Sequence, residues 1–267
     1  MTLAAQQFAR VIIAMQPYVE DIVFVGGWVH TLYLAEVNDG GAVQTEDIDV
    51  TLPHELLKGD RATLLDLASK AGFERDPISD MDDVAPWMVY RNADGFTIPI
   101  DFLTEGDPRR PVEIVGQPGL LAQGYSGQQM LLESARWLEV GSALHPSLEP
   151  AQRIRVPTLG AYVMQKAMSS AMRGPRGKAA KDLVYVFEIL RHPRLGPQVS
   201  SEIQLLRQRY PREFKAFVGA LGDALGSTVT LHDIAEQLIE AGRSYGAIDG
   251  VVASVYGRFS RLLAEVA

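Results

Sequence analysis

Short apolar runs and helical patterns alternate along the first half of this 267-residue chain. The runs have the length of β-strands and are rich in Val, Ile and aromatic residues. They occupy residues 22–25, 48–52, 88–90 and 97–103. The spacing of apolar residues predicts helices at residues 29–36 and 56–71, and a first amphipathic helix within residues 1–20. The alternation predicts a mixed β-sheet with helices packed against it.

From Pro157 onward the apolar positions recur about every 3.6 residues, which is the period of an α-helix. Pro and Gly residues separate the segments that show this period. The predicted helices cover residues 158–172, 178–191, 199–210, 211–221, 230–242 and 250–266. The change of pattern predicts an α+β protein with two domains, a sheet domain over residues 1–157 and a helical bundle over residues 158–267.

A β-hairpin is predicted at residues 88–103, because the turn-forming stretch from Asn92 to Gly95 separates two strand-like runs. Pro99 lies inside the second run and cannot donate a backbone hydrogen bond, so we expect an edge strand or a bulge there. Residues 106–156 are rich in Gly and Pro. Three further short strands are predicted in this region, at residues 111–115, 136–140 and 153–157.

Three segments contain candidate phosphate-binding and metal-binding residues. Gly26 and Gly27 follow the first strand-like run and precede a helix, so backbone amides there can face a phosphate. Asp47 and Asp49 are two residues apart, and in an extended chain both side chains project from the same face. Asp101 lies in a later strand. Because magnesium prefers oxygen ligands and leaves positions for substrate phosphates, these carboxylates predict a magnesium site for a nucleoside triphosphate.

Composition narrows the class of protein. Hydrophobic residues make up 47% of the chain, which is typical of globular proteins. No apolar run approaches the roughly 18 residues of a membrane span, and the N-terminus does not resemble a secretory signal. The chain has no cysteine, which excludes disulfides and thiolate sites and agrees with a reducing compartment. We therefore expect a cytoplasmic protein that does not bind membranes.

The formal net charge of −8 argues against broad non-specific binding to nucleic acid, since that affinity comes largely from Lys and Arg. One segment is basic although the chain as a whole is acidic. It contains Arg173, Arg176, Lys178 and Lys181 and no acidic residue. The segment is compatible with phosphate contact and equally with a solvated loop and helix start. For the five histidines, which include His30, we expect structural or surface roles.

The glycine pair, Thr45, the Asp-x-Asp pair and Asp101 together resemble the nucleotidyltransferase superfamily that includes DNA polymerase beta. Within it, the chain is similar to the toxin-like branch typified by the AbiEii and MenT proteins. Members of that branch also carry a helical Lys and, in the next helix, a Lys-Asp pair, which Lys166, Lys181 and Asp182 match. The resemblance covers roughly residues 20–190.

The resemblance implies a role for each matching residue. It implies catalysis by Asp47, Asp49, Asp101, Lys166 and Asp182. It implies nucleotide binding by Gly26, Gly27, Thr45 and Lys166, helped by Arg173, Lys178 and Lys181 of the basic segment. The three residues Asp47, Asp49 and Asp101 would hold Mg²⁺. Without the resemblance, Asp182, Tyr185 and Glu188 would be interpreted as the polar face of a helix. We also expect that replacing Lys166 weakens nucleotide binding without lowering thermal stability.

The implied reaction transfers a nucleoside monophosphate from a nucleoside triphosphate to a hydroxyl group and releases pyrophosphate. In the toxin-like branch the acceptor is often the 3′ end of transfer RNA, and an antitoxin protein is the usual partner. Two alternatives stay open. One is a small-molecule acceptor, as in similar antibiotic-modifying enzymes, which the acidic composition fits at least as well. The other is a non-catalytic binding or regulatory module, against which the presence of all three aspartates speaks.

Overall fold

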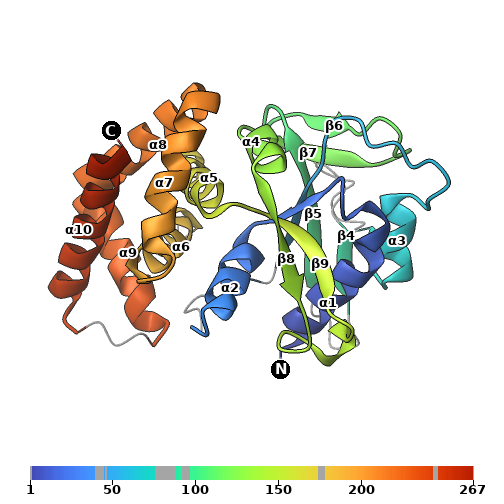
Figure 1. Cartoon of the computed structure of the whole chain (residues 1–267), viewed down its shortest axis with the longest axis horizontal. Helices are drawn as coiled ribbons and strands as arrows, with labels where there is room; N and C mark the ends of the chain where they lie inside the picture. The colour runs from blue at the N-terminus through green and yellow to red at the C-terminus, as the bar shows by residue number, and fades with distance from the viewer. Residues whose placement is uncertain are drawn as a thin grey trace. The chain divides into compact units, whose positions relative to one another are not determined.

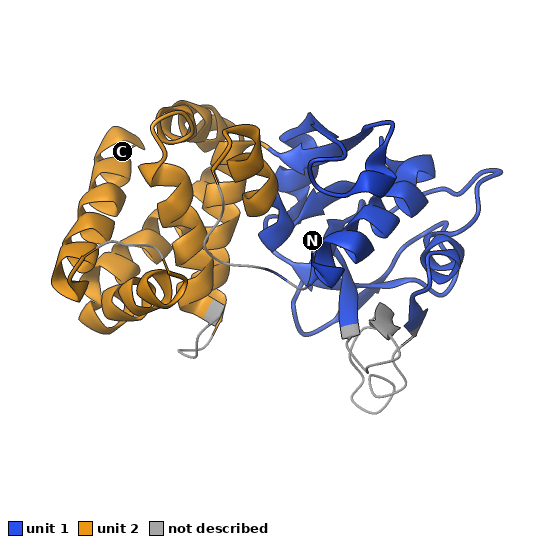
Figure 2. Ribbon diagram, turned by 90° about the horizontal axis from the view of Figure 1, so that it is seen from below, with its two compact units in different colours: residues 1–29, 45–157 blue, residues 30–44, 158–267 orange. Residues whose placement is uncertain are grey.

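The structure, a computed structural model, describes residues 2–39, 45, 47–75, 88–91, 97–173, 178–242 and 246–266. They form an N-terminal mixed sheet with flanking helices, followed by a helical region (Figure 1), which confirms the predicted α+β class. The chain divides into two compact units (Figure 2). The sheet unit contains residues 1–29 and 45–157, and the helical unit contains residues 30–44 and 158–267.

The sheet unit is built on seven strands among the described residues, in the order β1-β2-β5-β4-β3, with β7 also paired to β5 and β6 paired to β7. Their bounds are β1 Val23–Val25, β2 Ile48–Thr51, β3 Glu74–Arg75, β4 Met88–Arg91, β5 Thr97–Glu105, β6 Pro111–Glu113 and β7 Leu121–Tyr125. Strand β2 runs antiparallel to β1 and parallel to β5. A second, two-stranded sheet pairs β8 (Ala135–Val140) with β9 (Gln152–Pro157). The three strands predicted between residues 106 and 157 are therefore present.

Strand β5 is an interior strand, so the expectation of an edge strand at Pro99 is wrong. Strands β4 and β5 pair antiparallel as the predicted hairpin requires, and Pro99 is opposite Val89. On the other side, the register with β2 begins only at Ile100. Pro99 therefore precedes the parallel ladder and removes no hydrogen bond from it. The turn predicted at residues 92–95 lies outside the described residues.

Four α-helices begin in the sheet unit among the described residues: α1 Leu3–Met15, α2 Gly27–Glu36, α3 Leu64–Lys70 and α4 Gln128–Glu133. Helix α3 is shorter than the helix predicted at residues 56–71. The reason is local, because Gly59 adopts a left-handed φ of 54° and Thr63 caps the helix in a reciprocal capping box with Asp66. A positive φ ends a helical path, and the box starts a new one.

The core at the start of α2 is aromatic. Trp28 stacks on Phe8 of α1 with ring centroids 4.3 Å apart, and Phe24 of β1 meets Phe8 edge-on at 5.7 Å. All three side chains are buried, as aromatic rings of this size commonly are in a core. The contact fixes the first turn of α2 against α1.

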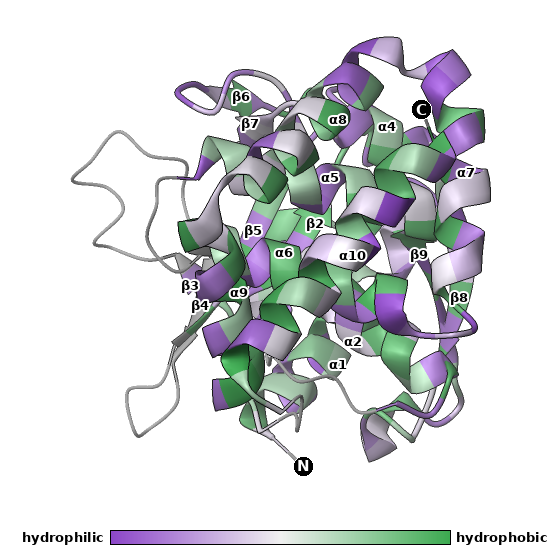
Figure 3. Ribbon diagram, turned by 90° about the vertical axis from the view of Figure 1, so that its left-hand side faces the viewer, coloured by the Kyte–Doolittle hydropathy of each residue, from purple (hydrophilic) through white to green (hydrophobic). Residues whose placement is uncertain are grey.

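The helical unit contains the rest of α2 and six further helices among the described residues. They are α5 Leu159–Met172, α6 Lys178–Arg191, α7 Gly196–Arg209, α8 Pro211–Gly226, α9 Thr228–Glu240 and α10 Ile248–Val266. The helices agree closely with the predicted segments. Along α10, Figure 3 shows hydrophobic and hydrophilic positions interleaved, and the residues Val251, Val255, Phe259, Leu262 and Val266 are buried. Such a stripe is the expected face of a bundle helix. No helix in the described part of the chain is long and apolar enough to cross a membrane.

Candidate functional site

The turn between β1 and α2 is shaped by Gly26. Its φ of 71° is left-handed, a conformation that glycine adopts without the clash of a side chain. A Cβ atom at this position would lie 1.7 Å from Oδ2 of Asp49 and 2.6 Å from its Cγ. The carboxylate of Asp49 therefore occupies the space that a side chain at Gly26 would need. Helix α2 begins at the next residue, Gly27, so the carboxylate is close to the start of a helix.

Asp49 and Asp101 are directly opposite each other on adjacent strands. The parallel register of β2 and β5 pairs Asp49 with Asp101, and their flanking residues Ile48 and Ile100 are also paired. Adjacent strands are about 4.8 Å apart, and residues in register project from the same face of the sheet. Ile48 and Ile100 are fully buried, whereas both aspartates are partly exposed. The sheet thus holds two carboxylates side by side on its more open face.

Asp47 and Thr45 are the other predicted residues on this segment. Asp47 is partly exposed and precedes β2 by one residue, while Thr45 is buried. Among the described residues, no three acidic or imidazole side chains are already gathered as a metal-binding group. Mg²⁺ commonly takes one or two carboxylates and completes its shell with water and substrate phosphates. The pair Asp49 and Asp101 fits that donor set, with Asp47 near in sequence, although a closed three-carboxylate cage is not preformed.

In the helical unit, Lys166 and Asp182 form a buried ion pair. Nζ of Lys166 on α5 donates to Oδ1 of Asp182 on α6 at 2.8 Å. Arg173, at the end of α5, approaches the second carboxylate oxygen at 3.2 Å. Lys166 is 5% exposed and Asp182 is 1% exposed, whereas the Arg173 side chain is 41% exposed. One buried carboxylate therefore fixes two cationic groups that come from the same neighbouring helix.

Lys178 and Lys181 lie in the first turn of α6. The Lys181 ammonium is 5.9 Å from the ring centroid of Tyr185, and the Lys166 ammonium is 5.3 Å from the same ring. The side chain of Lys178 and the residues 174–177 before it lie outside the part that is described. The basic segment predicted from the sequence thus contributes Arg173 and Lys181 to one cluster around Asp182 and Tyr185.

Two members of this cluster, Tyr185 and Glu188, were not among the site residues predicted from the sequence, and Asp182 was predicted only through the family resemblance. Asp182, Tyr185 and Glu188 are each 1% exposed, so they do not form a solvated helix face. Glu188 contacts Nε2 of His30 at 2.9 Å, and the imidazole packs on Tyr185 with centroids 4.6 Å apart. A signal was present in the sequence, because residues 183–190 are almost continuously apolar. A helix that is apolar all round is buried, and its polar residues are then buried as well.

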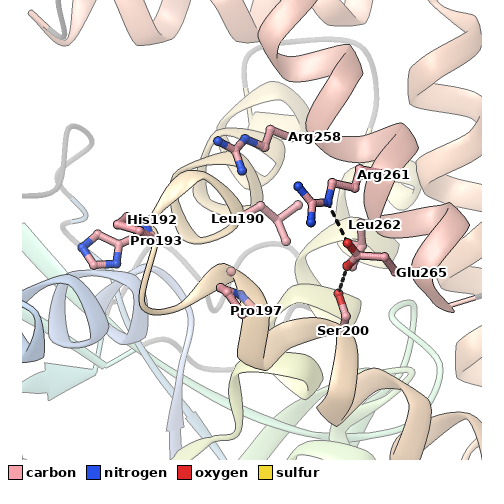
Figure 4. Close-up of a pocket in the computed structure, with 10 residues that line it drawn as sticks. Leu190, His192, Pro193, Pro197, Ser200, Arg258, Arg261, Leu262 and Glu265 are labelled. Carbon is pink, nitrogen blue, oxygen red and sulfur yellow. Dashed lines mark hydrogen bonds and ion pairs between the residues drawn. The ribbon is translucent and has the colours of Figure 1, made fainter.

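A cavity of about 300 Å³ lies elsewhere in the helical unit, between α6, α7 and α10 (Figure 4). None of the predicted site residues lines it. Figure 4 shows that Arg261 and Ser200 both reach Glu265, with Arg261 Nε 2.7 Å from the carboxylate and the Ser200 hydroxyl donating to its other oxygen. These two hydrogen bonds hold the pKa of Glu265 below its usual value. The polar groups are satisfied by one another, so we interpret them as a clamp between α7 and α10.

Comparison with known proteins places this arrangement in a family. Residues 5–201 match the sequence model of a family described as Nucleotidyltransferase. No curated protein matches the chain. Among solved structures, the chain is similar to an antigenic nucleotidyltransferase-like protein from Paracoccidioides brasiliensis, with 14% identity, a TM-score of 0.39, and coverage of 81% of this chain and 94% of that one. The family match spans the glycine turn, the facing aspartates and the Lys166–Asp182 pair, and the chain belongs to the nucleotidyltransferase family.

Proposed function

We propose that this protein is a magnesium-dependent nucleotidyltransferase that moves a nucleoside monophosphate from a nucleoside triphosphate to a hydroxyl group. The observation that carries the proposal is the placement of Asp49, which lies against Gly26 at the start of α2 and opposite Asp101 across the β2–β5 ladder. A helix start favours a phosphate, and two adjacent carboxylates favour a divalent cation. The two requirements of a metal–triphosphate complex thus meet at one turn.

Each residue has a role in the proposed reaction. Backbone amides at Gly26 and Gly27 hold the triphosphate, and Asp47, Asp49 and Asp101 hold Mg²⁺. When bound, the ion neutralises charge on the phosphate oxygens. The acceptor oxygen attacks the α-phosphorus, the bond to the bridging oxygen breaks, and pyrophosphate leaves. Asp101 accepts the proton of the attacking hydroxyl group. Catalysis rests on positioning and charge neutralisation, as in other phosphoryl transfers.

The basic residues of the helical unit have a supporting role in the proposal. Lys166 neutralises charge on the phosphates, and Arg173, Lys178 and Lys181 add to the positive potential. Asp182 acts on Lys166 through the 2.8 Å contact, which holds the ammonium in one position. A lysine that is already fixed loses less conformational freedom when it meets a phosphate. We therefore assign Asp182 to the orientation of Lys166, together with the catalytic role that the family resemblance implies.

Two observations bear on the identity of the acceptor: the resemblance to the toxin-like branch and the net charge of the chain. The toxin-like branch favours the 3′ end of transfer RNA as acceptor, with an antitoxin protein as the partner that controls the enzyme. A small hydroxylated molecule is the second candidate, and the net charge of −8 supports it because an acidic surface repels nucleic acid. A regulatory module without catalysis is the third, and it predicts nucleotide binding without transfer.

The test incubates the purified protein with each α-labelled nucleoside triphosphate, Mg²⁺ and total RNA, and in parallel with hydroxylated small molecules in place of RNA. We expect label to enter one class of acceptor and pyrophosphate to be released in equal amount. Asp49→Asn should abolish transfer, since the neutral amide binds Mg²⁺ poorly. The same change should leave the fold intact, because it removes one charge from a crowded anionic pair.

Two results would overturn the proposal. One is the absence of label in any acceptor and of pyrophosphate with every nucleotide. The other is full transfer by Asp49→Asn in the presence of Mg²⁺. Chelation of the metal provides an independent control, because it should stop the wild-type reaction without unfolding the protein.

A further inference from the structure

The charge of the chain is divided unevenly between its two parts. Residues 1–157 contain 11 Lys and Arg against 23 Asp and Glu, which gives a formal net charge of −12. Residues 158–267 contain 14 Lys and Arg against 10 Asp and Glu, which gives a net charge of +4. An asymmetry of this kind indicates that one part of a chain interacts with a polyanion such as nucleic acid. The total of −8 thus combines an acidic sheet region with a basic helical region.

Within the helical unit, basic side chains gather at the junction of α7 and α8 (Figure 1). Helix α7 ends at Arg209, and α8 begins two residues later at Pro211. Between residues 203 and 217 the sequence has one acidic residue, Glu213. The four cations at the junction are exposed and the two aromatic rings beside them are partly exposed. We call these six residues the junction surface: Arg207, Arg209, Tyr210, Arg212, Phe214 and Lys215.

The aromatic rings of the junction surface lie beside guanidinium groups. Cζ of Arg207 is 5.2 Å from the ring centroid of Phe214. Cζ of Arg209 is 5.4 Å from the ring centroid of Tyr210. The Phe214 ring also meets the buried ring of Phe217, with centroids 6.3 Å apart, so the core holds it in place. Bases of a single strand stack on aromatic rings and on guanidinium planes, while neighbouring cations contact the phosphates.

The electrostatics of the two helices explain only half of this positive charge. Arg207 and Arg209 are in the last turn of α7, where the helix dipole favours cations. Arg212 is in the first turn of α8, where the dipole disfavours a cation. Lys215 is three residues further on the same side of α8. Among the described residues, the structure pairs neither Arg212 nor Lys215 with an acidic side chain. These two cations therefore have no evident structural role.

We propose that the junction surface binds a single-stranded polynucleotide. Arg212 and Lys215 contact phosphates, and the guanidinium–ring pairs at Tyr210 and Phe214 receive unstacked bases. The bases of a duplex already stack on one another, so a single strand fits this surface better. The binding belongs to the helical unit and does not depend on the proposed transfer reaction. If transfer takes place, the junction surface favours a polynucleotide over a small molecule as the acceptor.

The test measures equilibrium binding of short fluorescent RNA and DNA strands in the absence of metal and nucleoside triphosphate. Arg212→Gln/Lys215→Gln should raise the dissociation constant at least tenfold and leave the melting temperature unchanged, because both side chains are exposed. Each lost phosphate contact should lower the slope of log affinity against log salt by about 0.7. Phe214→Leu keeps an apolar side chain against Phe217, and it should weaken binding about tenfold without changing that slope.

A matched control removes two positive charges near the opposite end of α7. Arg194 precedes α7 by two residues, and Arg258 of α10 lines the cavity beside the start of α7. Both side chains are exposed, and the start of α7 is about 20 Å of helix from the junction. Arg194→Gln/Arg258→Gln changes the net charge equally and should leave the affinity unchanged. An equal loss in this control would overturn the proposal, because overall charge would then explain the binding. Unchanged affinity in Arg212→Gln/Lys215→Gln would overturn it as well.

Further ligands identify what the junction surface recognises. Poly-glutamate has negative charge without bases, and if it displaces the strand as well as unlabelled RNA does, the surface fits an acidic protein segment and the proposal fails. Equal affinity for a duplex would contradict the role of the rings. Binding of either RNA or DNA supports the proposal, and a preference identifies the source of the strand.

The outcomes also separate this proposal from the proposed function. A wild type that transfers nucleotide but binds no strand through the junction surface refutes the present inference alone. A wild type that binds the strand there and transfers nothing refutes the proposed function alone.

Discussion

At the scale of single residues, Gly26 carries two requirements at once. Its φ of 71° favours glycine, and the carboxylate of Asp49 fills the place where any side chain would begin. Gly59 differs in one respect. Its φ is also positive, at 54°, but no atom lies within 4 Å of the place where its Cβ would be. The two glycines therefore separate the cost of a left-handed backbone from the cost of a collision.

We predict that Gly26→Ala lowers the free energy of unfolding more than Gly59→Ala does. A left-handed alanine costs about 1–2 kcal/mol at either position. The collision with Asp49 at Gly26 should add about 1–3 kcal/mol, which is the usual cost of overpacking. Urea unfolding of both variants measures the difference. Equal losses would show that Asp49 can move away without cost, and the turn would then not define its position.

The buried position of Lys166 beside Asp182 predicts how its replacement changes the stability of the protein. Its burial against Asp182 does not fit the sequence-based expectation that replacing it leaves stability unchanged. In Lys166→Ala, the buried carboxylate of Asp182 loses its 2.8 Å partner and keeps, among the described residues, the ion pair with the partly exposed Arg173. Removing one member of a buried pair costs about 3–5 kcal/mol.

We therefore predict that Lys166→Ala is destabilised by that amount, and that nucleotide binding must be measured at a temperature where the variant is folded. Lys181→Ala is the control, since Lys181 is one residue from Asp182 but is less buried, and it should cost under about 1 kcal/mol. Thermal unfolding of the two variants gives the comparison. Similar melting temperatures for both would contradict a structural role for the Lys166–Asp182 pair.

At the scale of elements, helix–helix contacts in the helical unit depend on a few polar links between otherwise apolar faces. Helix α6 presents Asp182, Tyr185 and Glu188 to its neighbours, and α10 presents Glu265 and Arg261 to α7. The first set is buried. The second set is more exposed, and its carboxylate has a lowered pKa because Ser200 and Arg261 donate to it. Because this pKa differs from that of the unfolded chain, the second set contributes to stability in a pH-dependent way.

We predict a pH-dependent contribution of Glu265 to stability. Its pKa in the folded protein is lower than its ordinary value of 4.5, so the unfolded chain takes up a proton first as pH falls. The stabilisation is complete above about pH 4.5 and disappears as pH falls through the folded pKa. Glu265→Gln should therefore be less stable than the wild type at pH 7, and the two should converge in acid. Urea unfolding at a series of pH values measures this, and a difference that does not change with pH would contradict it.

At the scale of the whole molecule, an acidic chain carries a site that we propose for an anionic substrate. The net charge is −8, and the proposed site contains three aspartates. Two aspartates on adjacent strands repel each other until a cation lies between them. Nucleotide and metal should therefore bind together, since each supplies charge that the other needs. The basic residues around Asp182 add positive charge in the helical unit.

We predict that the protein is stabilised by Mg²⁺ and nucleoside triphosphate together more than by the sum of their separate effects. A ligand at 100 times its dissociation constant adds about 2.7 kcal/mol to the free energy of unfolding. Thermal unfolding with metal alone, nucleotide alone and both gives the comparison. Asp49→Asn should abolish the joint effect. Additive shifts in the wild type would argue against a shared metal–triphosphate site.

The sequence by itself was sufficient for the local features. The period of apolar residues predicted each helix that the structure describes after Pro157, because each of those helices buries one or more faces in a bundle and its pattern must follow the helical repeat. The alternation around Asp49 predicted the strand, with Ile48 and Val50 buried. The spacing of Gly26, Gly27, Asp47, Asp49 and Asp101 was enough to predict the family that the match over residues 5–201 shows.

Only the tertiary structure decided which residues meet. The interior position of β5, the facing of Asp49 with Asp101, and the approach of Asp49 to Gly26 depend on strand order and register, which involve residues far apart along the chain. The contact between His30 and Glu188 also depends on long-range packing, because the two residues are 158 positions apart in the chain. Local pattern reports whether a residue faces a core or solvent. The partner across that core is set by long-range packing, and the proposed site is made of such partners.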